Sequence, residues 1–201
     1  MKVLNLYAGI GGNRKLWEDV EVTAVEQDKN IAGIYQGFFP KDKVLICDAH
    51  LFLLTHFKEF DFIWSSVPCP THSILNTTYS DKGWKNTIEY PDMRLYQEVI
   101  ILKHFFKGKY CVENVVSYYD PLILPQRVHK HYFWANFHIG DFPKQPQHFD
   151  DLETLYRIKG FDLTNRSVKN KRQVMRNCLN PYLGLHILNE SKRDIHPELF
   201  K

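Results

Sequence analysis

Five short apolar runs, each followed by glycine, acidic or other polar residues, constrain the fold of this chain more than any other feature. The first run, KVLNLY at residues 2–7, leads straight into the glycines of AGIGG. The other four runs lie at 21–28, 43–48, 60–66 and 109–116. Such runs, separated by segments with helical spacing, are typical of strands in a parallel sheet. The sequence therefore predicts an α/β fold with a doubly wound, mostly parallel sheet.

The segments between these runs predict the other elements. Residues 13–20 and 91–106 have the apolar spacing of amphipathic helices. The aromatic segment 129–139 is predicted to be extended, and residues 171–191 to form either a helix that breaks near Pro181 or a loop followed by a helix. Ligands of doubly wound folds bind beyond the carboxyl ends of the strands, so functional residues are expected there.

Length and composition limit the class of protein. A chain of 201 residues with 44% hydrophobic residues is long enough for a single domain with its own core. Its four cysteines form no CxxC pair, so we expect neither a metal site nor a disulfide framework. No apolar run approaches the roughly 18 residues of a membrane span. We expect a monomer or weak dimer in the reducing cytoplasm of a bacterial or phage-infected cell, without membrane contact.

A glycine-rich turn, YAGIGG at residues 7–12, follows the first predicted strand. It is either an ordinary strand-to-helix turn or one that lets the backbone approach a ligand. Glu26 at the end of the second strand can accept hydrogen bonds from two ribose hydroxyls, and Asp48 at the end of the third can accept one from an adenine amine. The glycine spacing fits neither GxGxxG nor GxxxxGK[ST], which favours a ligand without phosphates, namely S-adenosylmethionine. The expected cofactor-binding residues here are Tyr7, Ala8, Gly9, Ile10, Gly11, Gly12, Glu26, Gln27, Asp48 and Ala49.

Cys69 lies between Pro68 and Pro70 in SSVPCPTHS, just after the fourth strand. It has three candidate roles: half of a disulfide, a buried filler or a nucleophile held by a stiff loop. Glu113, near the end of the fifth strand, favours the nucleophile, although a salt-bridged acid is its alternative reading. A thiolate that adds to C6 of a pyrimidine builds negative charge on the ring, and a carboxyl at N3 stabilises that charge. C5 then becomes able to take a methyl group from a sulfonium.

Four segments, NLYAGIGG, AVEQD, DFIWSSVPCP and VENV, resemble in order and spacing the DNA cytosine-C5 methyltransferases. The resemblance covers residues 1–139 and a final segment near 172–188. It implies the Rossmann-like fold of class I methyltransferases, S-adenosylmethionine as donor with S-adenosylhomocysteine as product, and a flipped cytosine of duplex DNA as acceptor. It also implies Cys69 as nucleophile and Glu113 as the partner of N3, and it adds Pro68 and Asn177 to the cofactor-binding residues.

The chain departs from this family at its Arg-x-Arg motif, which holds the pyrimidine and a phosphate. QRVHKHYFW stands there, with His129 and His131 at the arginine positions and Arg127 and Lys130 beside them. The resemblance thus makes His131 and Arg127 further candidate catalytic residues. In the last motif, Arg176 takes the place of a glycine.

The family's target-recognition domain is reduced here to an insertion at residues 138–171. A segment of this size is too small to read several base pairs, so we expect short or loose recognition, a partner that supplies recognition, or a substrate other than duplex DNA. Residues 101–201 hold 16 Lys and Arg against 10 Asp and Glu, which suits a polyanionic partner. The candidate nucleic-acid contacts are Ser73, Lys130, Lys169, Lys171, Arg172 and Arg176.

Methylation of cytosine C5 in DNA, as in phage or restriction–modification enzymes, is therefore the leading function. The same chemistry on RNA is the first alternative. A degenerate module that binds S-adenosylmethionine or nucleic acid without turnover is the second. A donor carrying a group other than methyl is the third.

Overall fold

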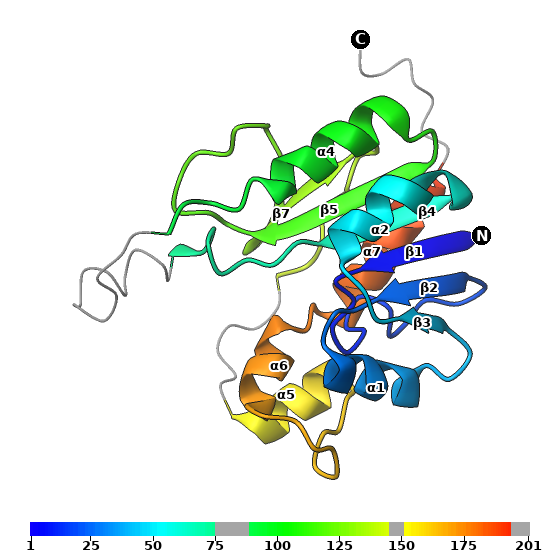
Figure 1. Ribbon diagram of the computed structural model, residues 1–201. Coiled ribbons are helices and arrows are strands. Elements are labelled where there is room, and N and C mark those ends of the chain that lie inside the picture. The colour runs from blue at the N-terminus through cyan, green and yellow to red at the C-terminus, as the bar shows by residue number, and fades with distance from the viewer. Residues whose placement is uncertain (75–88, 145–150, 194–201) are drawn as a thin grey trace.

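The computed structural model describes residues 1–74, 89–144 and 151–193. Its centre is a seven-stranded sheet with the strand order β3-β2-β1-β4-β5-β7-β6 (Figure 1). The strands are β1 (Lys2–Leu6), β2 (Glu21–Val25), β3 (Lys43–Leu45), β4 (Phe62–Ser66), β5 (Lys109–Val115), β6 (Gln126–Val128) and β7 (His131–Ala135). The helices are α1 (Lys29–Phe38), α2 (Ala49–His56), the short η1 (Phe57–Glu59), α4 (Arg94–Phe105), α5 (Leu152–Lys159), α6 (Lys171–Asn177) and α7 (Pro181–Lys192).

The strands from β3 to β5 are parallel, whereas β7 runs antiparallel to both β5 and β6. The strand order reverses between β1 and β4, as in a doubly wound fold. The predicted mostly parallel sheet is therefore confirmed. Its parallel strands bring the glycine turn, the two acids and the Cys-Pro loop to one edge.

Helices cover both faces of the sheet. On one face, Leu53 of α2 and Val99 and Leu102 of α4 pack on the apolar side chains of β1, β4 and β5. On the other face, Leu183 and Ile187 of α7 pack on the same strands, and Figure 1 shows α7 behind them. The sheet is thus buried on both sides, which explains why its strands read as nearly continuous apolar runs.

The helices α5 and α6 lie side by side next to α1 (Figure 1). Leu155 of α5 and Met175 of α6 share a core with Ile34 of α1 and Ile10 of the glycine turn. The described part of residues 138–171, the predicted insertion, therefore packs next to α1 and the glycine turn.

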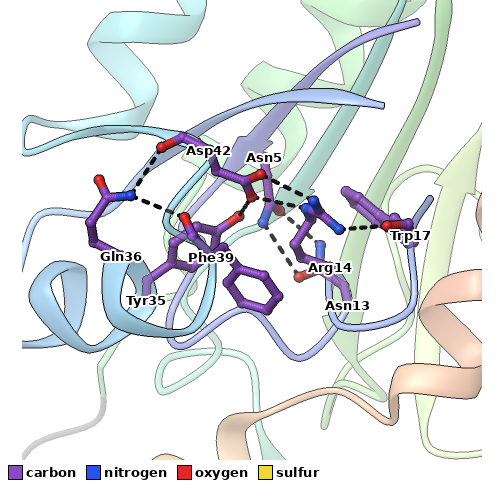
Figure 2. Close-up of polar contacts among 8 residues, drawn as sticks. All are labelled: Asn5, Asn13, Arg14, Trp17, Tyr35, Gln36, Phe39 and Asp42. Carbon is purple, nitrogen blue, oxygen red and sulfur yellow. Dashed lines mark hydrogen bonds and ion pairs between the residues drawn. The ribbon is translucent and has the colours of Figure 1, made fainter. Parts of the chain in front are cut away.

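Residues 13–20 form turns, so the helix predicted there is wrong. Figure 2 shows the polar contacts that hold this segment against its neighbours. Asn13 donates through Nδ2 to Oδ1 of Asn5, at 2.7 Å, and Nε of Arg14 lies 2.8 Å from Oδ2 of Asp42. Both pairs are buried or nearly so, and a regular helix would not leave these side chains facing their partners.

The C-terminal segment breaks at the predicted proline. α6 ends at Asn177, and α7 begins at Pro181 with the side chain of Asn180 accepting from the amides that follow. The helices α1, α2 and α5 were not expected from the sequence. For α2 the reason is its sequence AHLFLLTH, which is apolar on nearly every side and shows no helical period.

Candidate active site

The glycine turn after β1 folds back over the end of β2. The amide of Gly9 donates to Oε2 of Glu26 at 2.9 Å. The backbone takes positive φ values at Tyr7 (53°), Gly9 (55°) and Gly11 (88°), which glycine adopts without strain. A Cβ on Gly9 would meet no atom within 4 Å. The turn therefore exposes backbone to open space, as a ligand cradle requires.

Gly12 lies against the connection between α6 and α7. A Cβ on Gly12 would lie 2.5 Å from Sγ of Cys178 and 2.7 Å from the carbonyl oxygen of Leu179. We expect Gly12→Ala to lower the free energy of unfolding by about 1–3 kcal/mol, because the connection must move. Urea unfolding measures this. Gly33→Ala is the control, since a Cβ on Gly33 meets no atom within 4 Å, and equal midpoints for the two variants would contradict the close approach.

Two acids follow the neighbouring strands β2 and β3. Oε1 of Glu26 accepts from the amide of Asp28 at 2.9 Å, and Oδ1 of Asp48 accepts from the amide of Leu51 at 2.9 Å. The backbone amide of Glu26 donates to the carbonyl of Leu45 at 3.1 Å, so the two strand ends are joined. A carboxylate has about four acceptor positions, which leaves both acids able to accept from a ligand.

A buried carboxylate, Glu98 of α4, joins three segments around the turn. The hydroxyl of Tyr7 donates to its Oε1 and that of Ser65 to its Oε2, both at 2.6 Å. Nδ1 of His50 lies 3.0 Å from Oε1, and this hydrogen bond raises the pKa of His50. Glu98 thereby fixes the glycine turn, the start of α2 and the end of β4 relative to one another.

Glu98→Gln is expected to lower the free energy of unfolding by about 1–3 kcal/mol, because an amide nitrogen cannot accept from these donors. The pKa of His50 is expected to fall toward its ordinary value in the same variant. Chemical denaturation and an NMR titration of His50 measure the two effects. Glu59→Gln, at an exposed position of η1, is the control. An unchanged His50 titration would refute this account of the contact.

Cys69 lies in a tight turn after β4. Its carbonyl oxygen accepts from the amides of His72 and Ser73, both at 3.0 Å. Nδ2 of Asn114 in β5 donates to the carbonyl of Val67 at 3.0 Å. The segment that carries the thiol is thus held by hydrogen bonds on both sides, and one of them comes from the neighbouring strand.

Glu113 lies opposite Ser66 in the register of β4 and β5 and is only 9% exposed. Burial raises its pKa to about 7, although a hydrogen bond from Ser66 and the charge of Lys159 oppose the shift. Burial also raises the pKa of Cys69, and the carboxylate of Glu113 raises it further. The charge of Glu113 therefore acts on the Cys69 thiol, and the raised pKa lets the Glu113 carboxyl keep its proton to higher pH than an exposed glutamate does.

His131 of β7 faces this carboxyl. Its Nε2 lies 3.7 Å from Oε1 of Glu113. Burial lowers the pKa of His131 to about 4, with smaller contributions from Lys159, His129 and Lys130. The imidazole is therefore neutral at pH 7 and can hydrogen-bond without supplying a positive charge.

This arrangement of a glycine turn, strand-end acids, a cysteine loop and a glutamate matches a known family. The family model described as C-5 cytosine-specific DNA methylase matches residues 1–121, more than half of the chain. The chain belongs to this family. The resemblance stated from the sequence is confirmed, and the sheet has the Rossmann-like methyltransferase fold. Membership of this methylase family also implies S-adenosylmethionine as the cofactor.

Several solved structures are similar to this C-5 methylase. DNMT2 of Spodoptera frugiperda is 24% identical, with a TM-score of 0.40 over 57% of this chain and 35% of that one. A hypothetical protein of a Thermus species is 15% identical, with a TM-score of 0.41 over 67% and 73%. A TehB-like SAM-dependent methyltransferase of Corynebacterium glutamicum is 14% identical, with a TM-score of 0.37 over 57% and 54%. No curated protein matches the chain.

Most residues predicted for the cofactor and the chemistry of this methylase lie at one edge of the sheet. They follow β1, β2, β3 or β4, or lie within β5 and β7. Gln27 and Pro68 are exposed, whereas Ala49, the first residue of α2, is buried in the core. Asn177 ends α6 and is exposed, and its Oδ1 accepts from Gln173 at 2.7 Å.

Arg127, the other candidate catalytic residue of this segment, lies apart from Glu113 and His131. In the register of β6 and β7, Arg127 pairs with Tyr132. Tyr132 lies between His131 and Phe133, and Phe133 is the residue that pairs with Glu113. Side chains alternate between the faces of a sheet, so Arg127 lies on the face opposite Glu113 and His131. Its Nε donates to the carbonyl of His129 at 3.2 Å. The pairing therefore places the two candidate catalytic residues of this segment, Arg127 and His131, on opposite faces of the sheet.

The candidate nucleic-acid contacts fall into separate groups. Ser73 forms a bridge with Ser117, next to the Cys69 turn, and Lys130 is exposed in the turn between β6 and β7. Nζ of Lys171 donates to the carbonyl of Thr164 at 2.8 Å. The exposed members in or just before α6 are Lys169, Arg172 and Arg176.

Within residues 1–74, 89–144 and 151–193, no helix is long and apolar enough to cross a membrane. The same residues contain no cluster of three His, Cys, Asp or Glu side chains that could hold a metal ion.

Proposed function

We propose that this C-5 methylase transfers a methyl group to a cytosine of duplex DNA through a covalent adduct on Cys69, with short or loose sequence recognition. The observation that carries the proposal is the pairing of Cys69 with Glu113. Adjacent parallel strands present a half-buried thiol and a carboxyl whose pKa is about 7. Membership of the family supports cytosine C5 as the acceptor atom.

The residues of the glycine turn fit S-adenosylmethionine. The space beside Gly9 is open, and the acids after β2 and β3 have acceptor positions left for ribose hydroxyls and an adenine amine. Glu26 and Asp48 would hold the adenosine part, and residues 7–12 the amino-acid part. When bound, the cofactor supplies an electrophilic methyl group.

Cys69 begins the reaction by losing its proton to solvent and adding to C6 of the cytosine. The Glu113 carboxyl gives its proton to N3, so the ring remains neutral and C5 becomes a carbon nucleophile. The pKa of Glu113 near 7 suits this transfer, because the proton is present at neutral pH and is easily given up.

The same two residues complete the cycle after C5 has been methylated. N3 returns its proton to the Glu113 carboxylate. C5 then loses its proton to a base as the bond from C6 to the sulfur of Cys69 breaks, which restores the aromatic ring and releases the thiolate. No other covalent bond to the protein is needed.

Trapping on 5-fluorocytosine tests the proposal, since the C5 fluorine cannot leave as a proton does and the adduct persists. We expect wild-type protein with S-adenosylmethionine to form an adduct, stable in denaturing gels, with duplex DNA at least about tenfold faster than with RNA of the same sequence. Plain cytosine in the same DNA is the control, because it should be methylated and released.

RNA is the second candidate substrate, because the insertion is too small to read several base pairs of duplex DNA. The described part of the insertion also packs on α1 and the glycine turn. Faster trapping on RNA would replace DNA by RNA as the substrate. The absence of an adduct on both, with retained binding of S-adenosylmethionine, would favour the binding module instead.

A further inference from the structure

We propose that His72 is a positioning residue that sets where the thiol of Cys69 stands for its attack on the pyrimidine ring. It acts through the turn that carries Cys69 and takes no direct part in the chemistry. The proposal rests on the proposed function, because it needs Cys69 to be the nucleophile. The observation behind it is a fully buried imidazole that joins this turn to the segment after β5.

Residues 69–73 form one tight piece of backbone. The carbonyl oxygen of Cys69 accepts from the amides of His72 and Ser73, both at 3.0 Å. Pro70 restricts rotation of the chain between them, because its ring fixes φ. A displacement of His72 therefore moves Cys69 as well.

Both the backbone and the side chain of His72 attach this piece to its surroundings. His72 has no exposed surface, and its Nδ1 lies 2.6 Å from the hydroxyl of Tyr119. Its carbonyl oxygen accepts from the amide of Tyr118 at 3.1 Å. The next residue, Ser73, forms a bridge with Ser117. The turn is thus joined at several points to one short segment after β5.

Tyr119 is itself fixed by Tyr96 of α4. The hydroxyl of Tyr96 donates to that of Tyr119 at 3.3 Å and accepts from the amide of Leu122 at 3.1 Å. Tyr96 is only 3% exposed, and its ring packs edge-on against Trp134 of β7, with the ring centroids 6.1 Å apart. The chain of hydrogen bonds that ends on His72 therefore starts in the core of the sheet.

The direction of these hydrogen bonds suits a neutral imidazole. Because the hydroxyl oxygen of Tyr119 accepts from Tyr96, its own proton can point at Nδ1 of His72. Burial lowers the pKa of His72, although the charge of Asp92 opposes this shift, and the ring is neutral at pH 7. Nδ1 is therefore the acceptor, and Nε2 carries the proton.

The place of this turn matters because attack on C6 needs the sulfur within about 3–3.5 Å of the ring, and an error of about 1 Å can cost about 10²-fold in rate. Asn114 of β5 holds the chain just before Cys69 through the carbonyl of Val67. His72 holds it just after. Both contacts refer the thiol to β5, the strand that carries Glu113. His72 thus keeps the sulfur in register with the carboxyl that serves the same ring.

The rate of adduct formation on 5-fluorocytosine DNA, at saturating S-adenosylmethionine, measures the attack directly. We expect His72→Leu and Tyr119→Phe to form the adduct at least about tenfold more slowly than wild type, with unchanged binding of S-adenosylmethionine in calorimetry. His72→Asn, which keeps an acceptor close to the place of Nδ1, is expected to stay within about threefold of wild type. Tyr118→Phe is the matched control, because its ring packs against Tyr119 but its hydroxyl is not part of this chain of hydrogen bonds.

A double variant shows whether His72 and Tyr119 act as one unit. The combination of His72→Leu with Tyr119→Phe should be no slower than His72→Leu alone, because the second substitution removes the partner of a contact already lost. Rate losses that multiply would mean that the two side chains act independently, which contradicts the proposal.

An NMR spectrum of the His72 ring nitrogens tests the contact without any turnover. We expect the proton on Nε2, and a shift of the Nδ1 resonance in Tyr119→Phe that is absent in Tyr118→Phe. Tyr119→Phe removes a single hydroxyl, so it keeps the proposal testable if His72→Leu fails to fold.

Two further results would overturn the role of His72. One is adduct formation at the wild-type rate in Tyr119→Phe. The other is an equal loss of rate in His72→Asn and His72→Leu, which would make the imidazole a structural filler. A wild-type protein that traps neither DNA nor RNA overturns the proposed function and this role with it, whereas an Nδ1 resonance that ignores Tyr119→Phe refutes the contact alone.

Discussion

Cys69→Ser is expected to abolish the adduct on 5-fluorocytosine DNA and to lower methyl transfer by about 10⁴-fold or more. A serine hydroxyl has nearly the shape of the thiol, but it is far less acidic and a far weaker nucleophile. The turn that holds position 69 depends on backbone hydrogen bonds, so the substitution leaves its geometry intact.

Cys47→Ala is the matched control for this substitution, since it removes a half-buried thiol just after β3 that has no place in the mechanism. Binding of S-adenosylmethionine, followed by calorimetry, is expected to be equal in wild type and both variants. Residual trapping by Cys69→Ser comparable with wild type would show that another group attacks the ring.

Glu113→Gln is expected to lower the rate of methyl transfer by about 10²–10⁴-fold, because the amide cannot pass a proton to N3. The pH profile gives a sharper test. Wild-type activity needs the protonated carboxyl, whose pKa is about 7, so it should carry a descending component above pH 7. That component is absent in Glu113→Gln, whereas a variant with a merely structural defect would keep it.

The raised pKa of Glu113 also makes the free energy of unfolding depend on pH. Its pKa rises from 4.5 to about 7 on folding, so the folded chain binds more protons than the unfolded chain between these values. Wild type therefore loses stability as pH rises from 4.5 to 7, by up to about 3 kcal/mol, and the loss levels off above pH 7. Glu113→Gln should lack this loss and be the more stable protein at pH 8, as urea unfolding at pH 5 and pH 8 can measure.

The sequence predicted the structure correctly where the pattern that indicates an element or a site residue lies within one short segment. Strand ends followed by Gly9, Glu26 and Asp48 predicted an edge that the parallel sheet assembles. Cys69 and Glu113 could be placed near each other because successive apolar runs of this kind lie side by side in doubly wound sheets. The family model over residues 1–121 is consistent with that reading.

Contacts between distant segments carried no local signal. Glu98 looks like an ordinary polar position of a helix, and only the folded chain shows its bonds to Tyr7 and Ser65. Residues 13–20 have helical spacing, yet the buried pair of Arg14 with Asp42 outweighs this local preference.

Arg127 shows a different limit. A motif comparison fixes the order of residues along an edge strand, but the face on which each side chain emerges depends on register. The pairing of β6 with β7 decides that face, and it could not be read from QRVHKHYFW alone.

The shared packing of Leu155, Phe161 and Ile10 limits how this enzyme can evolve. A large recognition domain can be replaced as a unit when it folds independently of the domain that binds the cofactor. Here the described part of residues 138–171 shares a buried cluster with the glycine turn, so we expect deleting or swapping it to disturb that turn as well. If this segment contacts the target, we expect new target preferences to arise by single substitutions on the exposed side of α5 and α6.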